Sequence, residues 1–583
     1  MVVRAWPAAA AIAGGLLLTT AFPPAGFWPA APLAVALITF AIWRAGPDGP
    51  LGGPRLRGTS TAGKATAGQA TAGQATGGQA TGGQATGGDA TDGTAPARNP
   101  RPLRTGAVLG LLAGAAFFTV LLFWLHVIGP DAWLILAVAE ALYFVPLGLG
   151  IAAVRKLPWA PLWAACLWVA EEAIRGRWPL GGFTWGRLAF SQSASPLTRY
   201  ASLGGAPLLT FAVALAGSLL AALAVWTWPG RAVTDPGGPD RTESTAAQSA
   251  RARTAKRLAA AAGVLALAAA GPAIPLPRPN GHPLTTAVIQ GNVPRLGLGF
   301  LGQRATVLHD HVNAVHRLAA LVRAGRLPHP DLVILPENSS DIDPYQDPAA
   351  YALINSAVQD VGVPTLVGVL TFTRDGQHLQ NRGIVWSPGT GPGAYYVKRH
   401  PVPFGEYVPM RSVLDKYIKR LRFVPYDQVA GHRPGVLRLG QVTIGDVICF
   451  EVAYDSIVRD AVTHGGRVIV VQTNNADYGQ TDQPAQQLAV SRLRAVEHAR
   501  PVLIAATSGI SAIVTADGQV LTQSRQFTEA ILVRQIRSST TLTIADRLGE
   551  IPEWILTAAG TGAAIFGIMA LATRDRTRRR QEV

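Results

Sequence analysis

The stretch Val442–Glu451 reads Val-Thr-Ile-Gly-Asp-Val-Ile-Cys-Phe-Glu. Its β-branched residues predict a strand over 442–450, with Cys449 at the sharp end of that strand. A free cysteine in a soluble domain is either a small buried apolar residue or a nucleophile. The other cysteine, Cys166, lies in an apolar run, so we expect no disulfide between them. The surroundings of Cys449 therefore have to separate the two interpretations.

Two charged residues also follow apolar strand candidates. Glu337 comes directly after Leu332–Pro336, an apolar position that can raise the pKa of a carboxyl group toward that of a general base. Lys398 ends the run 395–397, where an ammonium group can stabilise an oxyanion and keep a nearby thiol in its thiolate form. Taken singly, the glutamate also fits an ordinary loop residue, and the lysine fits a solvated strand end.

Short β-branched runs alternate with helical patterns on both sides of these residues. Such alternation is typical of one layered α/β domain, which we expect at 276–551. On the helix predicted at 303–324, the spacing of His309 and His311 points them to different faces, so we expect no metal site there. The expected strands are 286–290, 332–335, 365–371, 383–387, 394–398, 442–450, 467–472 and 501–506, followed by a hairpin around Asp517-Gly518; the expected helices are 303–324, 347–360, 455–463 and 484–499.

The composition indicates that the remainder of the chain lies in a membrane. Hydrophobic residues make up 49% of the 583 residues and charged residues only 15%. Crossing roughly 30 Å of hydrocarbon takes about 20 residues of helix. We expect eight such helices, near 7–22, 26–43, 106–128, 132–154, 157–174, 203–228, 257–275 and 552–572.

One long loop between these helices has a different composition. Residues 58–93 repeat Ala-Thr-Ala/Gly-Gly-Gln/Asp units with almost no large apolar side chains, so they cannot bury enough surface to offset chain entropy. The expected organisation is two membrane helices at 1–43, a disordered loop at 44–105, five membrane helices at 106–275, the α/β domain at 276–551, an eighth helix at 552–573 and a basic tail at 574–583.

The distribution of positive charge predicts the orientation. Lysine and arginine are concentrated in the 44–105 loop, in alternate short loops and in the tail, which places both termini in the cytoplasm. An even number of crossings then puts the α/β domain on the extracytoplasmic face. Because the formal charge of +16 lies mainly in these segments, we expect no nucleic-acid partner. Four arginines in the segment after the fifth helix argue against this orientation: Arg175, Arg177, Arg187 and Arg199.

Three blocks together resemble the Glu-Lys-Cys triad of the nitrilase superfamily, and they occur in the order of that family. They are Pro336-Glu337-Asn338, Lys398–Pro409 and Ile448-Cys449-Phe450-Glu451. With the Gln-Gly-Asn block at 290–292 and helices on both sides, the chain resembles the apolipoprotein N-acyltransferases, membrane-embedded members of that superfamily. The resemblance implies a polytopic bundle of about eight transmembrane helices plus a nitrilase-like αββα sandwich.

The resemblance also implies the chemistry. Glu337, Lys398 and Cys449 would be catalytic, and Cys449 would carry an acyl chain as a thioester. The implied donor is a phospholipid, and the acceptor is the N-terminal α-amino group of a diacylglyceryl-modified apolipoprotein. No cofactor and no metal are implied, and the protein would be a monomer in the plasma membrane of a bacterium.

Other charged and aromatic residues are implied to support this triad. Glu406, Glu451 and Phe450 would orient it or contact substrate, although ordinary hydrogen-bonded loop acids have the same pattern. The helix predicted at 484–499 is similar to one that packs behind the family's site, where ion pairing is expected of Arg492, Arg494 and Glu497.

The chain departs from the family pattern at three places. Phe450 stands where a tyrosine is often found, Gly299 lies beside Phe300 where a tryptophan is common, and Asp477-Tyr478 replaces an aromatic pair. These departures concern lipid or lipoprotein contacts and leave the triad intact.

Two other functions remain compatible with parts of the pattern. A membrane-tethered carbon-nitrogen hydrolase would use the same triad, but one helix would suffice as its tether. A catalytically silent lipoprotein-binding scaffold would keep the fold, but it would not need all three triad residues.

Overall fold

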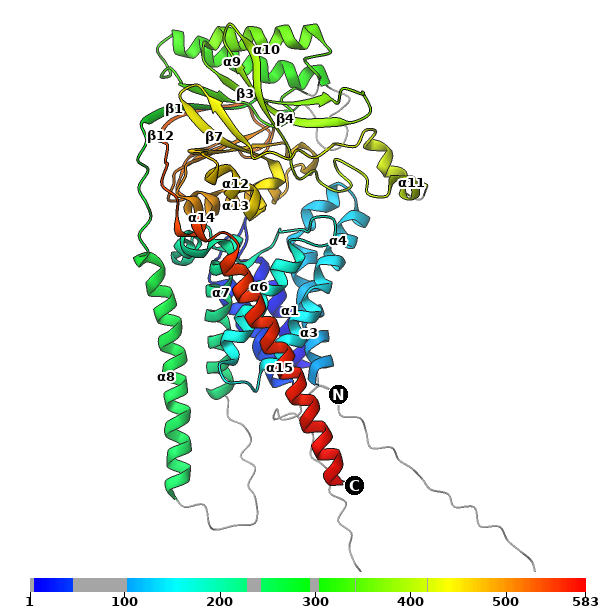
Figure 1. Cartoon of the computed structure of the whole chain (residues 1–583), viewed down its shortest axis with the longest axis vertical. Coiled ribbons are helices and arrows are strands. Elements are labelled where there is room, and N and C mark those ends of the chain that lie inside the picture. Colours follow the sequence, from blue (N-terminus) through cyan, green and yellow to red (C-terminus); the bar gives the residue numbers. More distant parts are fainter. Residues whose placement is uncertain are drawn as a thin grey trace, which may run out of the picture.

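The computed structural model describes residues 5–45, 102–227, 243–293, 304–340, 342–416 and 418–582. The repeat at 58–93 and the Gly299–Phe300 pair lie outside these residues. Figure 1 shows an α/β domain stacked on a bundle of helices. Helix α8 runs into the domain and α15 runs out of it, so the domain is inserted between two helices of the bundle.

Two six-stranded sheets form the centre of the domain. The first has the order β12-β1-β2-β3-β4-β5 and the second β11-β10-β9-β8-β7-β6. Parallel pairs occupy the middle of each sheet, and antiparallel pairs lie at the edges. The strands of the first sheet are β1 (Pro283–Gln290), β2 (Leu332–Ile334), β3 (Thr365–Phe372), β4 (Leu379–Ser387), β5 (Gly391–Val397) and β12 (Ala530–Arg537); those of the second are β6 (Val436–Leu439), β7 (Val442–Ile448), β8 (Val468–Thr473), β9 (Val502–Ala506), β10 (Ala512–Val514) and β11 (Val520–Gln523).

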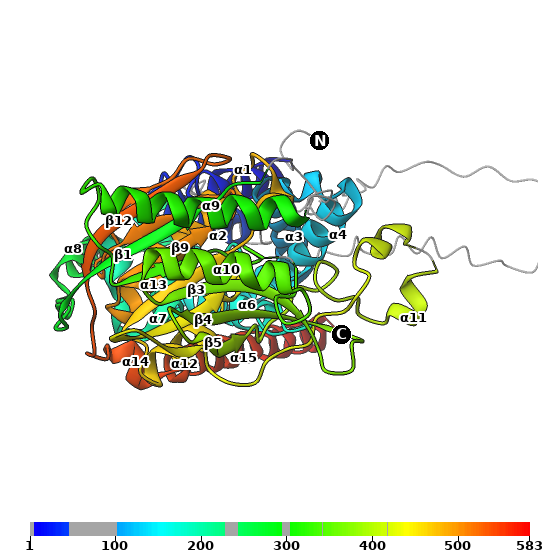
Figure 2. The same ribbon diagram turned by 90° about the horizontal axis from the view of Figure 1, so that it is seen from above.

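Helices cover the outer face of each sheet and complete an αββα sandwich. Helices α9 (Arg304–Arg323) and α10 (Pro348–Val361) lie side by side over the first sheet (Figure 2). Helices α12 (Asp455–Thr463) and α13 (Gln483–His498) cover the second sheet and face the bundle. The predicted sandwich is therefore confirmed. Shorter elements are α11 (Arg411–Leu414), α14 (Ile544–Leu548) and the 3-10 turns at Lys419–Phe423, Cys449–Ala453 and Ala476–Tyr478.

The structure differs from the predicted strands in two respects. The strand predicted over 442–450 ends at Ile448, because Cys449 has a φ of 55° and begins a 3-10 turn. Strands β6 and β12 were not predicted. Both are defined by antiparallel partners, β7 and β1, and such pairing depends on neighbours rather than on a local pattern.

The bundle has a helix at each of the eight predicted positions. Within the described residues, five segments are long and apolar enough to cross a membrane: 102–121, 130–154, 196–227, 251–273 and 551–573. Helices α1, α2 and α6 are shorter, with 14, 15 and 16 residues, so the number of spans remains a prediction. The bounds are α1 (Trp6–Thr19), α2 (Ala30–Arg44), α3 (Pro102–Leu121), α4 (Pro130–Leu142), α5 (Phe144–Val154), α6 (Ala160–Arg175), α7 (Ala201–Thr227), α8 (Glu243–Ala273) and α15 (Ile551–Glu582), with 3-10 turns at Phe123–Val127, Leu188–Gln192 and Pro196–Tyr200.

The four arginines that argued against the predicted orientation all donate hydrogen bonds within the protein. Arg175 donates to Glu171 at 2.7 Å, and Arg177 donates to Glu553 on α15. Arg187 donates to Asp455 of the α/β domain at 2.7 Å, and Arg199 donates to the carbonyl of Pro272 in α8. Their positions are therefore explained by internal partners, and they are not free loop charges of the kind that sets topology.

Helices α3 and α5 pack closely because three glycines meet between them. A Cβ atom on Gly110 would lie 2.0 Å from the carbonyl oxygen of Phe144, and one on Gly148 would lie 2.2 Å from that of Gly106. Small residues four positions apart allow helix backbones in a membrane to approach in this way.

Gly110→Ala is therefore expected to separate α3 from α5 and to destabilise the purified protein by about 1–3 kcal/mol. Thermal unfolding in detergent would show a lower melting temperature. Gly562→Ala in α15 is the matched control, because its Cβ would meet no atom within 4 Å. Equal melting temperatures for the two variants would contradict the close packing.

Candidate active site

The three residues of the predicted triad come together where strands of both sheets end. Glu337 lies just after β2, Lys398 directly follows β5, and Cys449 directly follows β7. All three side chains are buried. The carboxyl ends of parallel strands are a common place for such residues, because they meet at one edge.

Glu337 is held by three hydrogen bonds. Its Oε1 accepts from Lys398 Nζ at 3.0 Å and from the Asn381 side-chain amide at 2.7 Å. Its Oε2 accepts from the backbone N–H of Asn474 at 2.7 Å. The carboxylate therefore has a fixed orientation, as a general base requires.

Lys398 lies between two carboxylates. Its Nζ donates to Glu337 and, at 2.6 Å, to Glu406 Oε1, while Glu406 Oε2 accepts from the backbone N–H of Val402. Burial alone lowers the pKa of Lys398, but Glu337 and Glu406 outweigh burial and raise this pKa well above its ordinary value. Lys398 is therefore a permanent cation in the site.

Cys449 occupies a strained position. Its φ of 55° is in the left-handed region, which side chains rarely adopt, and such strain is typical of functional sites. The Thr473 hydroxyl donates to Cys449 Sγ at 3.2 Å. Burial raises the pKa of the Cys449 thiol to about 12, with a further contribution from Glu337, although Lys398 acts in the opposite direction. The expectation that Lys398 keeps the thiol ionised is therefore wrong for the free site, and the thiol needs a base to react.

Glu451 connects the lysine segment to the cysteine turn. Its Oε2 accepts from the backbone N–H of Ile448 at 2.7 Å, and its Oε1 accepts from those of Arg399 and His400 at 2.6 and 3.0 Å. The Tyr396 hydroxyl donates to both oxygens at 3.0 Å. The side chain is fully buried. Of the two roles implied for Glu451, orienting the triad is the one that this geometry supports.

Tyr396→Phe would remove one donor from buried Glu451. A hydrogen bond to a charged group contributes about 1.5–3 kcal/mol, so we expect a lower melting temperature and slower turnover. Tyr395→Phe is the matched control, because Tyr395 is the neighbouring residue on β5 and is exposed. If both variants behaved like the wild type, Glu451 would not depend on Tyr396.

Phe450 joins the site to the membrane helices. Its ring stacks on those of Phe183 and Trp185, both with centroids 5.5 Å away, and these two residues lie in the segment between α6 and α7. Trp124, after α3, contacts Tyr478 with centroids 5.0 Å apart. Aromatic side chains from the bundle therefore lie next to the residue that follows Cys449.

Arg494 fixes the turn that follows the cysteine. Its guanidinium donates to the carbonyls of Val452 and Ala453 at 2.8 and 2.9 Å, and it pairs with Asp455 at 2.6 Å and Glu497 at 2.5 Å. The ion pairing predicted for Arg494 and Glu497 is thus confirmed. Arg492 instead donates to the backbone carbonyl of Gly518, so the prediction was wrong for that residue.

Three polar residues of the site were not predicted: Asn381, Thr473 and Asn474. Thr473 and Asn474 follow a predicted apolar strand at 467–472, which is the same signal that identified Glu337. Asn381 precedes the strand predicted at 383–387, and its role depends on the long-range position of β4 beside Glu337.

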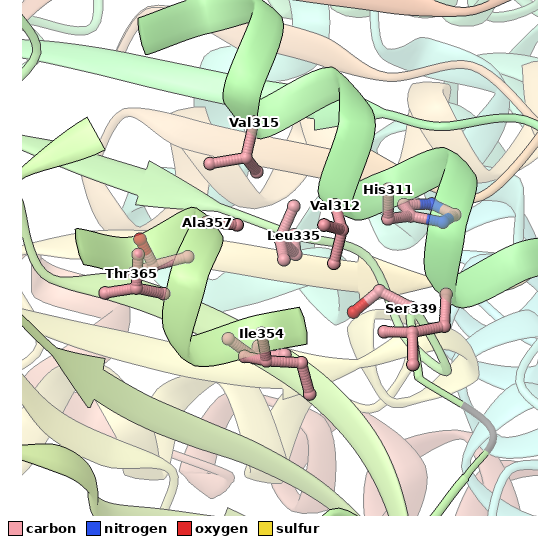
Figure 3. A pocket seen from close by; sticks show the side chains of 11 residues that line it. His311, Val312, Val315, Leu335, Ser339, Ile354, Ala357 and Thr365 are labelled. Atoms are coloured by element: carbon pink, nitrogen blue, oxygen red, sulfur yellow. The ribbon is translucent and has the colours of Figure 1, made fainter. Parts of the chain in front are cut away.

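A small void elsewhere in the domain has no part in this site. It has a volume of about 10 Å³ and lies between α9, α10 and the first sheet, where mostly apolar side chains surround it (Figure 3). His311 lines it, and burial lowers the pKa of this imidazole to about 4. His309 is exposed, so the two histidines do face different ways as predicted. Among the described residues, no group of three or more acidic, histidine or cysteine side chains could hold a metal ion.

The helix bundle and the α/β domain each match a known family. Residues 95–219 match the apolipoprotein N-acyltransferase N-terminal domain, and residues 285–545 match carbon-nitrogen hydrolase. The chain is 37% identical to an apolipoprotein N-acyltransferase of Mycolicibacterium smegmatis, over 97% of this chain and 86% of that protein. It is 26% identical to one of Geobacter metallireducens, over 80% of this chain and 87% of that protein.

Solved structures share similarity with part of the chain. An amidase from Nesterenkonia sp. is 16% identical with a TM-score of 0.32, covering 47% of this chain and 97% of that chain. A carbon-nitrogen hydrolase from Helicobacter pylori G27 is also 16% identical, with a TM-score of 0.33, covering 44% of this chain and 89% of that chain.

Proposed function

Because this chain belongs to the apolipoprotein N-acyltransferase family, we propose that it uses Glu337, Lys398 and Cys449 to move an acyl chain from a phospholipid to a lipoprotein. The acceptor is the N-terminal α-amino group of a diacylglyceryl-modified cysteine. The observation that carries the proposal is the meeting of a fixed carboxylate, a permanent cation and a buried thiol next to aromatic residues of a membrane bundle. The similarity extends over the bundle as well, which favours acyl transfer over a tethered hydrolase or a silent scaffold.

The first half-reaction forms a thioester. Glu337 takes the proton of Cys449, and the sulfur attacks the ester carbonyl of the phospholipid. Lys398 Nζ and a backbone N–H after Cys449 stabilise the oxyanion of the tetrahedral intermediate. The ester C–O bond then breaks, and the lysophospholipid leaves with the proton held by Glu337.

The second half-reaction transfers the acyl chain to nitrogen. The free α-amine of the lipoprotein attacks the thioester carbonyl, a C–N bond forms and the C–S bond breaks. Glu337 takes the proton that nitrogen loses and returns it to the sulfur of Cys449. Water would also hydrolyse the thioester. The apolar surroundings of Cys449 limit the access of water to the thioester and so favour transfer to the amine over hydrolysis.

The wild-type protein is expected to gain the mass of one acyl chain when it is incubated with a defined phospholipid and no lipoprotein. Intact-mass spectrometry would detect this adduct, and hydroxylamine should remove it because it is a thioester. Adding a diacylated lipopeptide should move the acyl chain to the peptide.

Cys449→Ser should not form the hydroxylamine-labile adduct, while Cys166→Ser should form it as the wild type does. Cys166 lies in α6 and makes no contact with the triad among the described interactions. A folded wild-type protein that forms no adduct would contradict the phospholipid-donor mechanism.

The α/β domain is proposed to face the extracytoplasmic side, with both termini in the cytoplasm, as the positive charge of the loops predicts. Single cysteines can test this in a background without Cys166 and Cys449. Met410 in the domain is 71% exposed, and Thr577 near the end of α15 is also exposed. A membrane-impermeant maleimide should label Met410→Cys in intact spheroplasts and Thr577→Cys only after lysis, whereas the reverse pattern would place the domain inside.

A further inference from the structure

Asp477 lies in the 3-10 turn Ala476–Tyr478, four residues after the threonine that contacts Cys449. The turn is held by its neighbours. The backbone N–H of Asn474 donates to Glu337 at 2.7 Å, and the Asn475 side chain donates to Gln483 and Gln487 at 2.8 Å each. Its position beside the triad is therefore fixed by contacts that do not involve the Asp477 side chain.

One oxygen of the Asp477 carboxyl group has no partner within the described part of the chain, and the side chain as a whole is half-buried. Its Oδ1 is inaccessible to solvent and accepts no hydrogen bond there. Burial raises the pKa of Asp477 to about 6, with additional contributions from the negative charges of Glu337 and Glu406. A carboxylate oxygen that is shielded from water and has no partner is costly, and groups of this kind are concentrated at functional sites.

The charges around Asp477 favour a cation. Lys398 already donates to Glu337 and Glu406, and among the described contacts its ammonium group forms no hydrogen bond to Asp477. Tyr478 beside it contacts Trp124 of the bundle, which places the turn between the triad and the membrane helices. A lipid-anchored amine that approaches from the bundle would therefore meet Asp477 close to the thioester.

We propose that Asp477 binds the α-ammonium group of the acceptor lipoprotein and takes one proton from it. This inference rests on the function proposed above. The ammonium group loses two protons during transfer. One goes to Asp477 and leaves the free amine that attacks the thioester; the other goes through Glu337 to the sulfur of Cys449. Asp477 then releases its proton to solvent before the next turnover.

The test measures both half-reactions separately in the full-length protein, by intact mass and with a diacylated lipopeptide as acceptor. Asp477→Asn keeps the size of the side chain and removes its charge. At neutral pH, we expect the ratio of the transfer rate constant to the acylation rate constant to fall by about 100-fold, the usual size of a general-base contribution. Asp482→Asn is the matched control, because Asp482 is exposed at the start of α13 and should keep the wild-type ratio.

The dependence on pH distinguishes proton transfer from a packing defect. An α-amino group has a pKa of about 7.7–8.0, so above that range the acceptor arrives deprotonated. The fall in the ratio of the transfer to the acylation rate constant in Asp477→Asn should therefore become smaller as pH rises. If the substitution only disturbed packing, the ratio would stay low at every pH. The negative charges that act on Asp477 are those of Glu337 and Glu406, and Tyr478 is its neighbour in the chain; all three residues are present both in the wild type and in Asp477→Asn.

The outcomes separate this inference from the proposed function. A wild-type ratio in Asp477→Asn, with acylation intact, would overturn the role of Asp477 and leave the thioester mechanism standing. A deficit that does not change with pH would also overturn it. A wild-type protein that forms no acyl-enzyme would overturn both.

Discussion

A buried chain of charged side chains links the membrane bundle to the turn that carries Cys449. Each member contacts the next, and together they run from α6 through the α/β domain back to α7, where Glu497 accepts from the backbone N–H of Ala206 at 3.2 Å. Removing one partner of a buried ion pair leaves an uncompensated charge and costs about 3–5 kcal/mol. The position of the nucleophile relative to the membrane therefore depends on this chain. Its members are Glu172, Arg187, Asp455, Arg494 and Glu497.

Inside the site, one ammonium group contacts more than one carboxylate. Lys398 donates to two carboxylates, whereas Glu451 accepts hydrogen bonds from backbone N–H groups and from the Tyr396 hydroxyl. Burial and the charge of Glu337 raise the pKa of the Cys449 thiol, which favours its protonated form in the free site. A thiol that stays protonated in the empty site is less open to oxidation than a thiolate would be.

Local sequence signals were sufficient for most of this architecture. Apolar runs with polar residues at their ends predicted β2, β5 and β7, because strand propensity and the position of a strand end are both local. Glu337, Lys398 and Cys449 were only candidates on that basis, and it was the resemblance of the three blocks to the nitrilase superfamily that made them a triad. Strand β12 and the role of Asn381 were missed, because each is defined by a partner distant in the sequence. The raised pKa of Cys449 could not be predicted from sequence for a related reason. It results from burial and from Glu337, which only the assembled fold provides.

The first and last strands of the domain lie next to each other. Strands β1 and β12 pair antiparallel from Pro283 opposite Arg537 to Gln290 opposite Ala530, so the chain enters and leaves the sandwich at one place. A module with adjacent ends can be acquired between two helices without rearranging either the module or its host. The geometry is thus compatible with an origin in which a water-soluble enzyme was spliced, as one continuous gene segment, into an ancestral membrane protein.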